Sequence, residues 1–405
     1  MRSVEEHQRV VLGDAQPLEA VRVSLLDADS LVLAESVTAG WPLPSFDNSS
    51  MDGYAVRAID VAGATEPSPV RLPVRGDIAA GQDGAQPLEP GTAVRIMTGA
   101  PVPEGADAVV PVEWTDGSTD EVSIARAPDL GAHIRRRGED VAAGEIVLAP
   151  GTPINARVIA MLAAVGIAGV PVHRRPRVTV ISTGDELVDP GVDLGPGQIV
   201  DSNSYMLTAA VREAGADAVR VGPVRDDEEE LERVLVEEAA RSDLILTSGG
   251  VSMGAYDTVK AVLLRTGGVD FVKVAMQPGM PQGSGLVGST PIVTLPGNPV
   301  SSFVSFEVFV RPLIRRLLGH TSLERPRLHA ICSREFASPV GKMQFARVSL
   351  STRDGLMYAE PEGGQGSHII GGLARADGLA VIPQQVGRVS VSDELTVMDL
   401  RGGTR

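Results

Sequence analysis

Hydrophobic positions recur with two periods along this chain, and the change of period divides it into regions. Short β-branched runs alternate with stretches of helical period between residues 177 and 318. This alternation predicts βαβ units with right-handed crossovers and a mostly parallel sheet. The expected strands are 177–181, 219–221, 244–246, 269–274 and 292–295. The expected helices are 204–214, a helix capped by Asp226 or Asp227 with Leu231, Val234, Leu235 and Ala239 on one face, 259–264 and 300–318.

The remaining regions have different patterns. Amphipathic helices are expected near 4–11, 18–26 and 154–165, whereas residues 40–137 are dense in Gly and Pro and hold short alternating runs. Because the helical segments on both sides have the same character, the β-rich part is interpreted as an insertion. The fold class is α/β multidomain, with a central doubly wound domain. The expected domains are 1–40 with 138–175 (elongated), 41–137 (β-rich), 176–322 (α/β) and 323–405 (small β-domain).

Composition excludes several classes of protein. A chain of 405 residues is too long for one compact core. Its net charge of −16 disfavours nucleic acid and membrane partners, and aromatic residues make up only 3%. Cys332 is the sole cysteine, so no intramolecular disulfide can form, and it is expected to be core filler. The amino terminus lacks an apolar signal region, which favours a cytoplasmic protein.

Three Gly- and hydroxyl-rich segments fall at the carboxyl ends of predicted strands, where open α/β sheets bind ligands. Backbone N–H groups of glycines and of a capped helix start suit a phosphate-bearing anion. We therefore expect an anion site at this edge. The segments are Thr183-Gly184-Asp185-Glu186, the run 247–254 with Ser248, Gly249, Gly250 and Ser252, and Pro296-Gly297-Asn298-Pro299 with Ser301.

Carboxylates gather at the same strand ends. Asp185, Glu186, Asp226 and Asp257 would repel a phosphate unless a cation were present. Magnesium binds one or two carboxylates together with phosphate oxygens, so Mg²⁺ is the expected ion.

Three segments outside this region are too unusual for plain loops. Residues 45–55 form a long polar loop, and Arg135-Arg136-Arg137 is a basic cluster in an acidic protein. Residues 365–368 are a weaker candidate, for which a tight turn is an equally good interpretation.

Taken together, these segments resemble the MoeA family of molybdopterin molybdenumtransferases, which is related to the gephyrin E-domain. The motifs follow the family order over nearly the whole chain: DNSSMDGYAV, RIMTGAPVPEGADAVV, RRRGEDV, STGDEL, TSGGVSMGAYD, LPGNPVSS and GQGSH. The resemblance implies that molybdate is inserted into adenylylated molybdopterin with release of AMP, in a Mg²⁺-dependent reaction. It also implies a homodimer with its active site between subunits.

The resemblance implies a role for each matching position. Glu186, Asp226 and Asp257 would hold the metal, and Lys273 would offset ligand charge. Asp52, Asp140, Thr98 and Arg135 would line the cleft from the N-terminal domains, and Arg347 and Ser367 from the C-terminal domain. Molybdopterin adenylyltransferase and apo-molybdoenzymes are the implied protein partners.

One stretch departs from the family. Where members often carry Lys-x-x-x-Lys-Pro-Gly-Lys-Pro, this chain has Lys273, then Gln277 and Met280 in place of two lysines. The loss of two charges weakens anion attraction and favours a variant with lower oxyanion affinity, a changed preference between molybdate and tungstate, or a paralogue. Two alternatives stay open: a non-catalytic molybdopterin-binding scaffold, and an adenylyltransferase-like nucleotide enzyme.

Overall fold

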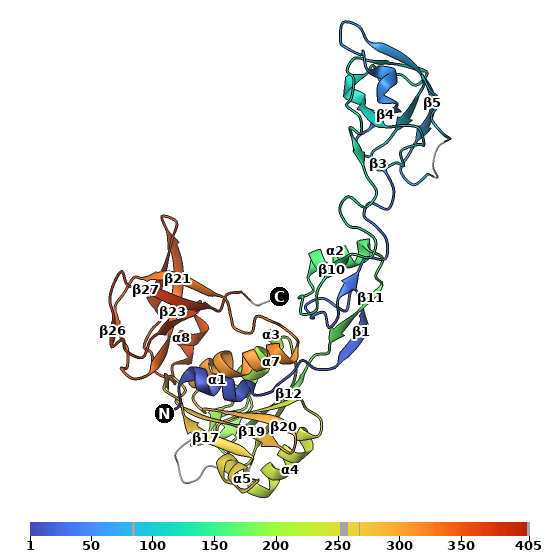
Figure 1. Ribbon diagram of the computed structural model, residues 1–405. Helices are drawn as coiled ribbons and strands as arrows, with labels where there is room; N and C mark the ends of the chain where they lie inside the picture. Colours follow the sequence, from blue (N-terminus) through green and yellow to red (C-terminus); the bar gives the residue numbers. More distant parts are fainter. Residues whose placement is uncertain (83–85, 252–257, 267, 403–405) are drawn as a thin grey trace.

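The computed structural model describes residues 1–82, 86–251, 258–266 and 268–402. The chain is elongated: a β-rich unit stands at one end, an α/β unit and a C-terminal β-unit lie at the other, and a small unit joins them (Figure 1). In the described part, no helix combines the length and apolar character needed to cross a lipid bilayer.

The joining unit is built from segments on both sides of the β-rich part. Strand β1 (Ala20–Ser24) pairs with β11 (Gly169–His173), and β2 (Val37–Thr38) pairs with β10 (Ile146–Leu148). Helix α2 (Ala156–Ala164), capped by Asn155, lies where a helix was expected. The helix predicted near 18–26 is wrong, because Val21 and Val23 alternate with polar residues and the segment pairs as β1.

A stalk in which two segments of the same chain run antiparallel carries the β-rich unit. In it, the Leu43 N–H donates to the Val141 carbonyl at 2.8 Å, and the Asp140 N–H donates to the Leu43 carbonyl at 3.0 Å. The unit's central sheet has the order β7-β4-β6-β5-β8. Its strands are β3 (Asn48–Ser49), β4 (Gly53–Val56), β5 (Val70–Ile78), β6 (Ala93–Ile96), β7 (Ala108–Pro111), β8 (Glu121–Ile124) and β9 (Ile134–Arg135), with short helices η1 (Ala58–Val61) and η2 (Val112–Trp114).

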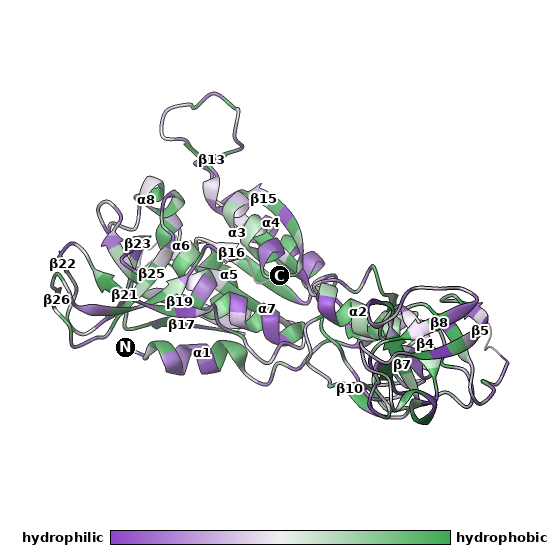
Figure 2. Cartoon of the chain, turned by 90° about the horizontal axis from the view of Figure 1, so that it is seen from above, coloured by the Kyte–Doolittle hydropathy of each residue, from purple (hydrophilic) through white to green (hydrophobic). Residues whose placement is uncertain are grey.

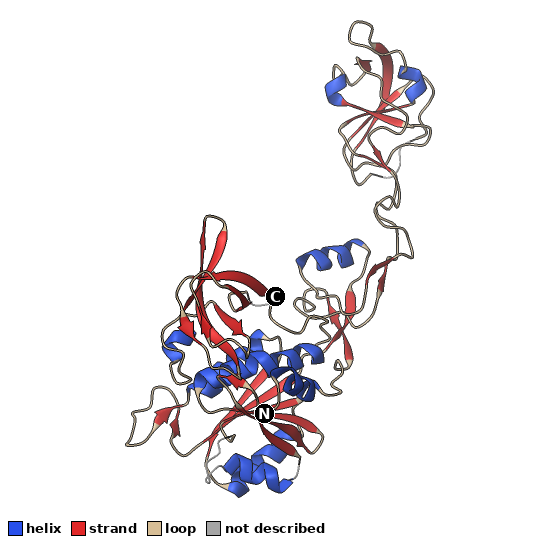
Figure 3. Ribbon diagram, turned by 60° about the vertical axis from the view of Figure 1, so that its left-hand side comes forward, coloured by secondary structure: helices blue, strands red, loops and turns tan. Residues whose placement is uncertain are grey.

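The α/β unit holds a six-stranded sheet of order β15-β12-β16-β20-β19-β17. The first four strands are parallel, which confirms the expected doubly wound class, and β19 and β17 run in an antiparallel hairpin. Helices cover both faces (Figure 3). The strands are β12 (Arg177–Thr183), β15 (Asp217–Val224), β16 (Leu244–Ser248), β17 (Val269–Lys273), β19 (Pro281–Val287) and β20 (Thr290–Leu295).

Each face of this sheet has its own apolar core. One core involves α3 (Ser202–Glu213) and α7 (Arg311–Leu317), and the other involves α4 (Glu228–Ala239) and α5 (Thr258–Thr266). The long final helix expected at 300–318 is present as α6 (Pro299–Ser305), a π-helical turn η3 (Phe306–Val310) and α7. Asp227 caps α4, and Arg233 pairs with Glu237 one turn further along the helix.

Two further features belong to this unit. An arm formed by β13 (Leu187–Val188), β14 (Ile199–Val200) and the loop between them stands out from the molecule (Figure 2). Helix α1 (Val4–Leu12) begins with a capping box between Ser3 and Glu6 and packs against η3 and α7.

The C-terminal unit is a small closed barrel. Its sheet runs β18-β23-β24-β21-β27-β25, and an extra pairing of β23 with β25 closes the ring. Strand β18 (Met276–Gln277) comes from the α/β unit and joins the two units. The other elements are β21 (Arg327–Cys332), β22 (Phe336–Ala337), β23 (Met343–Arg353), β24 (Leu356–Pro361), α8 (Ile370–Ala374), β25 (Gly378–Ile382), β26 (Arg388–Val389) and β27 (Glu394–Asp399).

Candidate active site

Strand order places a ligand crevice between β12 and β16. The chain leaves β12 and returns on one side as β15, and then crosses to the other side as β16. The helices that follow the two strands consequently pack on opposite faces of the sheet, which leaves a gap at the carboxyl ends. Thr183 ends β12 and Ser248 ends β16.

A cavity of about 130 Å³ occupies this point. Three of the sequence-predicted segments meet around it, together with the start of α3. The lining residues are Thr183, Glu186, Leu187, Ile199, Val200, Asp201, Ser202, Asn203, Ser248, Gly249, Gly297 and Pro299. The structure thus brings together strand ends that lie more than a hundred residues apart in the chain.

Two glycines shape the loops beside this cavity. Gly184 has φ of +143°, and a Cβ there would lie 2.4 Å from Oε2 of Glu186, so the carboxylate of Glu186 folds back over the loop. Gly250 has φ of +85°, and a Cβ there would clash with Val259 at 2.3 Å. The positive φ at both positions disfavours any residue other than glycine, and at Gly250 the Val259 side chain also leaves no room for a Cβ.

Asp185 and Asp226 face each other at the ends of β12 and β15. The Asp185 N–H donates to Asp226 Oδ2 and the Asp226 N–H donates to Asp185 Oδ1, both at 3.3 Å. Both residues are exposed. In the described residues, no group of three His, Cys, Asp or Glu side chains is arranged to hold a metal ion. The predicted ligand Asp257 and the predicted Ser252 lie outside the described residues.

A side chain that the sequence did not single out ties the cavity together. Asn203, in the first turn of α3, donates from Nδ2 to the Gly297 carbonyl at 2.6 Å. This bond fixes the distance between α3 and the loop that precedes α6. The signal in the sequence was the position of Asn203 at the start of a predicted helix, beside a predicted site.

Lys273 ends β17 at the same edge of the sheet, and it is exposed. Along β17 it shares a face with Phe271. Phe271 pairs across the sheet with Gly283, Gly283 with Thr294, and Thr294 with Thr247. The hydroxyls of Thr247 and Thr294 are buried and have no hydrogen-bond partner in the described part of the chain. This face of the sheet therefore carries the polar side chains of Thr247 and Thr294 in addition to Lys273.

The start of α6 meets the C-terminal unit. The Val300 N–H donates to the Ser367 carbonyl at 3.1 Å, so the predicted loop around Ser367 docks on the helix that follows Pro296 and Asn298. Asn298 is the N-cap residue of α6 but makes no side-chain capping bond, and Ser301 is buried within the helix.

Arg347 lies inside the C-terminal unit, where it braces this docking loop. Its side chain is only 1% exposed, and its guanidinium donates to the carbonyls of Gly364 and Gly366. Gln365 completes the brace, because its side chain bonds both the N–H and the carbonyl of Arg347. Burial lowers the pKa of Arg347. This geometry supports the loop rather than presenting Arg347 to a ligand.

The β-rich unit pairs two predicted residues. Both the N–H and the hydroxyl of Thr98 donate to Asp52 Oδ1, at 2.7 and 2.9 Å. These two bonds hold the pKa of Asp52 below its usual range. Arg135 is exposed on β9, and Asp140 is exposed in the stalk. Within one chain, β3 and β4, which flank Asp52, lie far from β12 and β16 (Figure 1).

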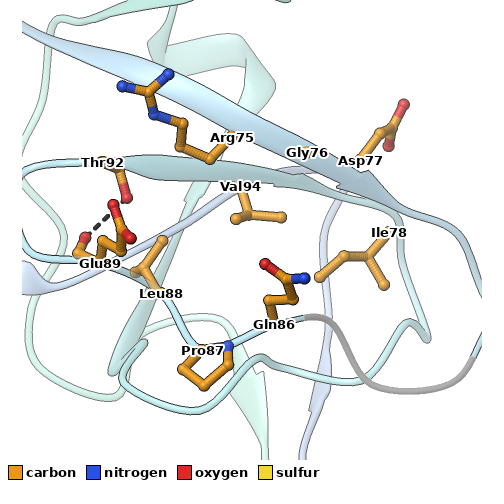
Figure 4. A pocket seen from close by; sticks show the side chains of 10 residues that line it. All are labelled: Arg75, Gly76, Asp77, Ile78, Gln86, Pro87, Leu88, Glu89, Thr92 and Val94. Carbon is orange, nitrogen blue, oxygen red and sulfur yellow. Dashed lines mark hydrogen bonds between the residues drawn. The ribbon is translucent and has the colours of Figure 1, made fainter.

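The β-rich unit also holds a larger cavity, of about 360 Å³ (Figure 4). It lies along β5 and β6, where Ile78, Leu88 and Val94 give it apolar walls. The Thr92 hydroxyl donates a hydrogen bond to the Glu89 carbonyl at its side. None of the residues that line it is among those predicted from the sequence.

Comparison with known proteins gives three matching families. Residues 2–166 match the MoeA N-terminal region (domain I and II), residues 179–316 a probable molybdopterin binding domain, and residues 329–400 the MoeA C-terminal region (domain IV).

Full-length relatives agree with these matches. "Molybdopterin molybdenumtransferase 2" of Mycobacterium tuberculosis is 52% identical and covers 99% of this chain and 100% of its own. "Molybdopterin molybdenumtransferase" of Haemophilus influenzae is 36% identical and covers 94% of each chain. A crystal structure of a molybdopterin biosynthesis MoeA protein from Pyrococcus horikoshii has a TM-score of 0.85 at 32% identity, covering 99% of both chains.

Proposed function

Because the chain belongs to the MoeA family of molybdopterin molybdenumtransferases, transferases of molybdenum cofactor biosynthesis, we propose that it inserts molybdate into adenylylated molybdopterin and releases AMP. The observation that carries this proposal is the cavity at the crossing point of the sheet, beside the facing carboxylates of Asp185 and Asp226.

The carboxylates suit a divalent cation. Asp185 and Asp226 hold two negative charges close together in solvent, an arrangement that a hard cation with oxygen ligands relieves. Asp226 with Glu186 and Asp257 would hold Mg²⁺, and Asp185 supports Asp226. When bound, Mg²⁺ supplies neutralisation of phosphate oxygens and of the charge that develops on the leaving group.

The chain's own groups would bind and orient the phosphoanhydride. Thr183 and Ser248 offer hydroxyls beside the cavity, and the Gly249 N–H holds the turn after Ser248 in place by donating to the Leu295 carbonyl at 2.9 Å. A molybdate oxygen would attack the adenylyl phosphorus, and the bond to the bridging oxygen would break, so that molybdopterin keeps its phosphate. A dithiolene sulfur would then bond to molybdenum and displace AMP, which carries the transferred oxygen, and the second sulfur would displace a further molybdate oxygen as water. Lys273 would offset the charge of the bound oxyanion, so positioning and electrostatics carry the reaction.

The distant half of the site would come from a second copy of the chain. Asp52, Thr98, Arg135 and Asp140 belong to the β-rich unit and its stalk. That unit stands far from β12 of its own chain (Figure 1). A homodimer that places one copy's β-rich unit over the other copy's cavity would unite the two halves. Molybdopterin adenylyltransferase would then deliver the substrate, and apo-molybdoenzymes would accept the product.

The decisive experiment is a defined reaction. The purified protein is incubated with adenylyl-molybdopterin, molybdate and Mg²⁺, and both AMP and active cofactor are measured. Formation of both products, dependent on molybdate and Mg²⁺, is expected. Tight substrate binding without AMP would instead support the scaffold. In a parallel reaction with ATP and free molybdopterin, formation of adenylyl-molybdopterin and pyrophosphate would support the nucleotide enzyme.

A further inference from the structure

The first residues of the chain lie against the α/β and C-terminal units, far from the joining unit that follows them in sequence (Figure 1). Helix α1 buries Val4 in an apolar cluster that also contains Val274, Val304 and Phe345. His7 makes an edge-on contact with Phe309 of η3 at 4.7 Å. Segments from three parts of the chain therefore share one core.

The chain's start also extends a ladder of backbone bonds. The Arg2 N–H donates to the Lys273 carbonyl and the Ala275 N–H donates to the Arg2 carbonyl, both at 2.9 Å. On the other side of this segment, the Met343 N–H donates to the Ala275 carbonyl at 2.9 Å. The Arg2 side chain adds an ion pair with Asp270 at 2.9 Å. Residues 273–275 are thus held between the N-terminus and the barrel.

Lys273 needs such support because of its place in the sheet. It is the last residue of β17, which is the edge strand. On the hairpin side the Val274 N–H donates to the Met280 carbonyl at 2.7 Å, so the Lys273 carbonyl faces the open edge of β17, where the Arg2 N–H reaches it. Strand ends with few partners fray, and a frayed strand would not hold a side chain in one place.

We propose that residues 2–12 are a positioning element for Lys273: the backbone of Arg2 pairs with the open edge of the chain at residues 273–275, and the docked helix α1 keeps Arg2 in place. This inference rests on the proposed function, in which Lys273 meets the anionic substrate. We therefore expect that undocking α1 lowers the affinity for the oxyanion substrate, although every group that contacts the substrate is still present.

The test uses full-length variants in matched pairs. Val4→Asp places a charge at a side chain that is 6% exposed, and Val10→Asp makes the same change at one that is 49% exposed on the same helix. Arg2→Pro removes the N–H that bonds Lys273, while Arg2→Ala removes only the exposed ion pair. Arg2→Pro thus keeps the test open if Val4→Asp fails to fold.

Hydrogen exchange at Ala275 reports docking, and the KM for molybdate reports its consequence. Val4→Asp and Arg2→Pro should lose protection at Ala275 and raise KM by about tenfold with kcat nearly unchanged, and their controls should match the parent. Lost protection with an unaltered KM would overturn the proposal.

If the parent shows no turnover, the proposed function fails by itself. Titration with molybdate alone then decides: weaker binding by Val4→Asp supports the positioning role, and equal or absent binding overturns it.

Discussion

Asp185 and Asp226 hold each other's backbone: each carboxylate accepts a hydrogen bond of 3.3 Å from the peptide N–H of the other. Asp226→Ala should lower Mg²⁺-dependent AMP release by about 100-fold, since metal neutralisation of phosphate charge contributes several kcal/mol. The measurement is AMP formation against Mg²⁺ concentration, with circular dichroism to confirm folding.

Asp193→Ala is the matched control, because Asp193 is an exposed carboxylate on the arm outside the cavity. The control should keep parental activity. Full activity in Asp226→Ala would remove Asp226 from the metal site.

Asn203→Ala should raise the KM for adenylyl-molybdopterin by about tenfold, because the cavity loses the bond from Nδ2 to the Gly297 carbonyl. Steady-state kinetics with the adenylylated substrate measure this change. Asn203→Asp keeps the size but replaces the donor with an acceptor, so it should be equally impaired. If Asn203→Asp matches the parent, the tether to Gly297 is not what shapes the cavity.

A composite site predicts complementation between subunits. Asp52→Ala and Asp226→Ala should each be inactive, yet an equal mixture of the two refolded together should regain about a quarter of parental activity. Half of the dimers are then mixed, and each mixed dimer carries one intact site. Activity of the mixture no higher than that of either variant would place Asp52 and Asp226 in the same chain's site, or Asp52 outside it.

Gln277→Lys should lower the KM for molybdate several-fold, because a cation returns where strand β18 joins the barrel. The gain should shrink as ionic strength rises, since charge attraction is screened. Molybdate dependence at low and high salt measures both effects. Identical curves for Gln277→Lys and the parent would make the replacement neutral.

His7 makes stability depend on pH. Burial and the neighbouring Arg2 lower the pKa of His7 from 6.5 to about 4. Between these values the unfolded chain binds more protons, so stability supplied by neutral His7 is complete above 6.5 and is lost as pH falls toward 4. The loss is on the order of 3 kcal/mol. His7→Phe should flatten this part of the pH profile in urea unfolding, and an unchanged slope would show that other groups carry it.

The α/β unit could be predicted from the sequence because its signals are local. Each strand and helix has its own period, and capping residues such as Asp227 mark the starts. Strand β19 was missed because Gly283 and Gly285 break the alternation. A Cβ at Gly283 would lie 2.1 Å from Oγ1 of Thr294 and 2.9 Å from Phe271, so the strand needs glycine for packing that the sequence does not display.

The site was predictable where strand ends carry chemistry, as at Thr183, Ser248 and Gly297. It was not predictable where the role depends on distant contacts. Asn203 matters through a carbonyl 94 residues away. The burial of Arg347 and its engagement with a loop appear only once the barrel has closed. Such roles follow from tertiary neighbours, which no local pattern specifies.

The stalk of two antiparallel segments, through Leu43 and Val141, connects the β-rich unit to the rest of the molecule. That unit carries Asp52, Thr98 and Arg135. The orientation of the stalk therefore sets the positions of all three residues together. A substitution at Leu43 would leave every reacting group intact, yet it would re-aim half of the proposed site at once. Substitutions in the stalk would therefore change the activity through the orientation of the β-rich unit, while the reacting groups stay the same.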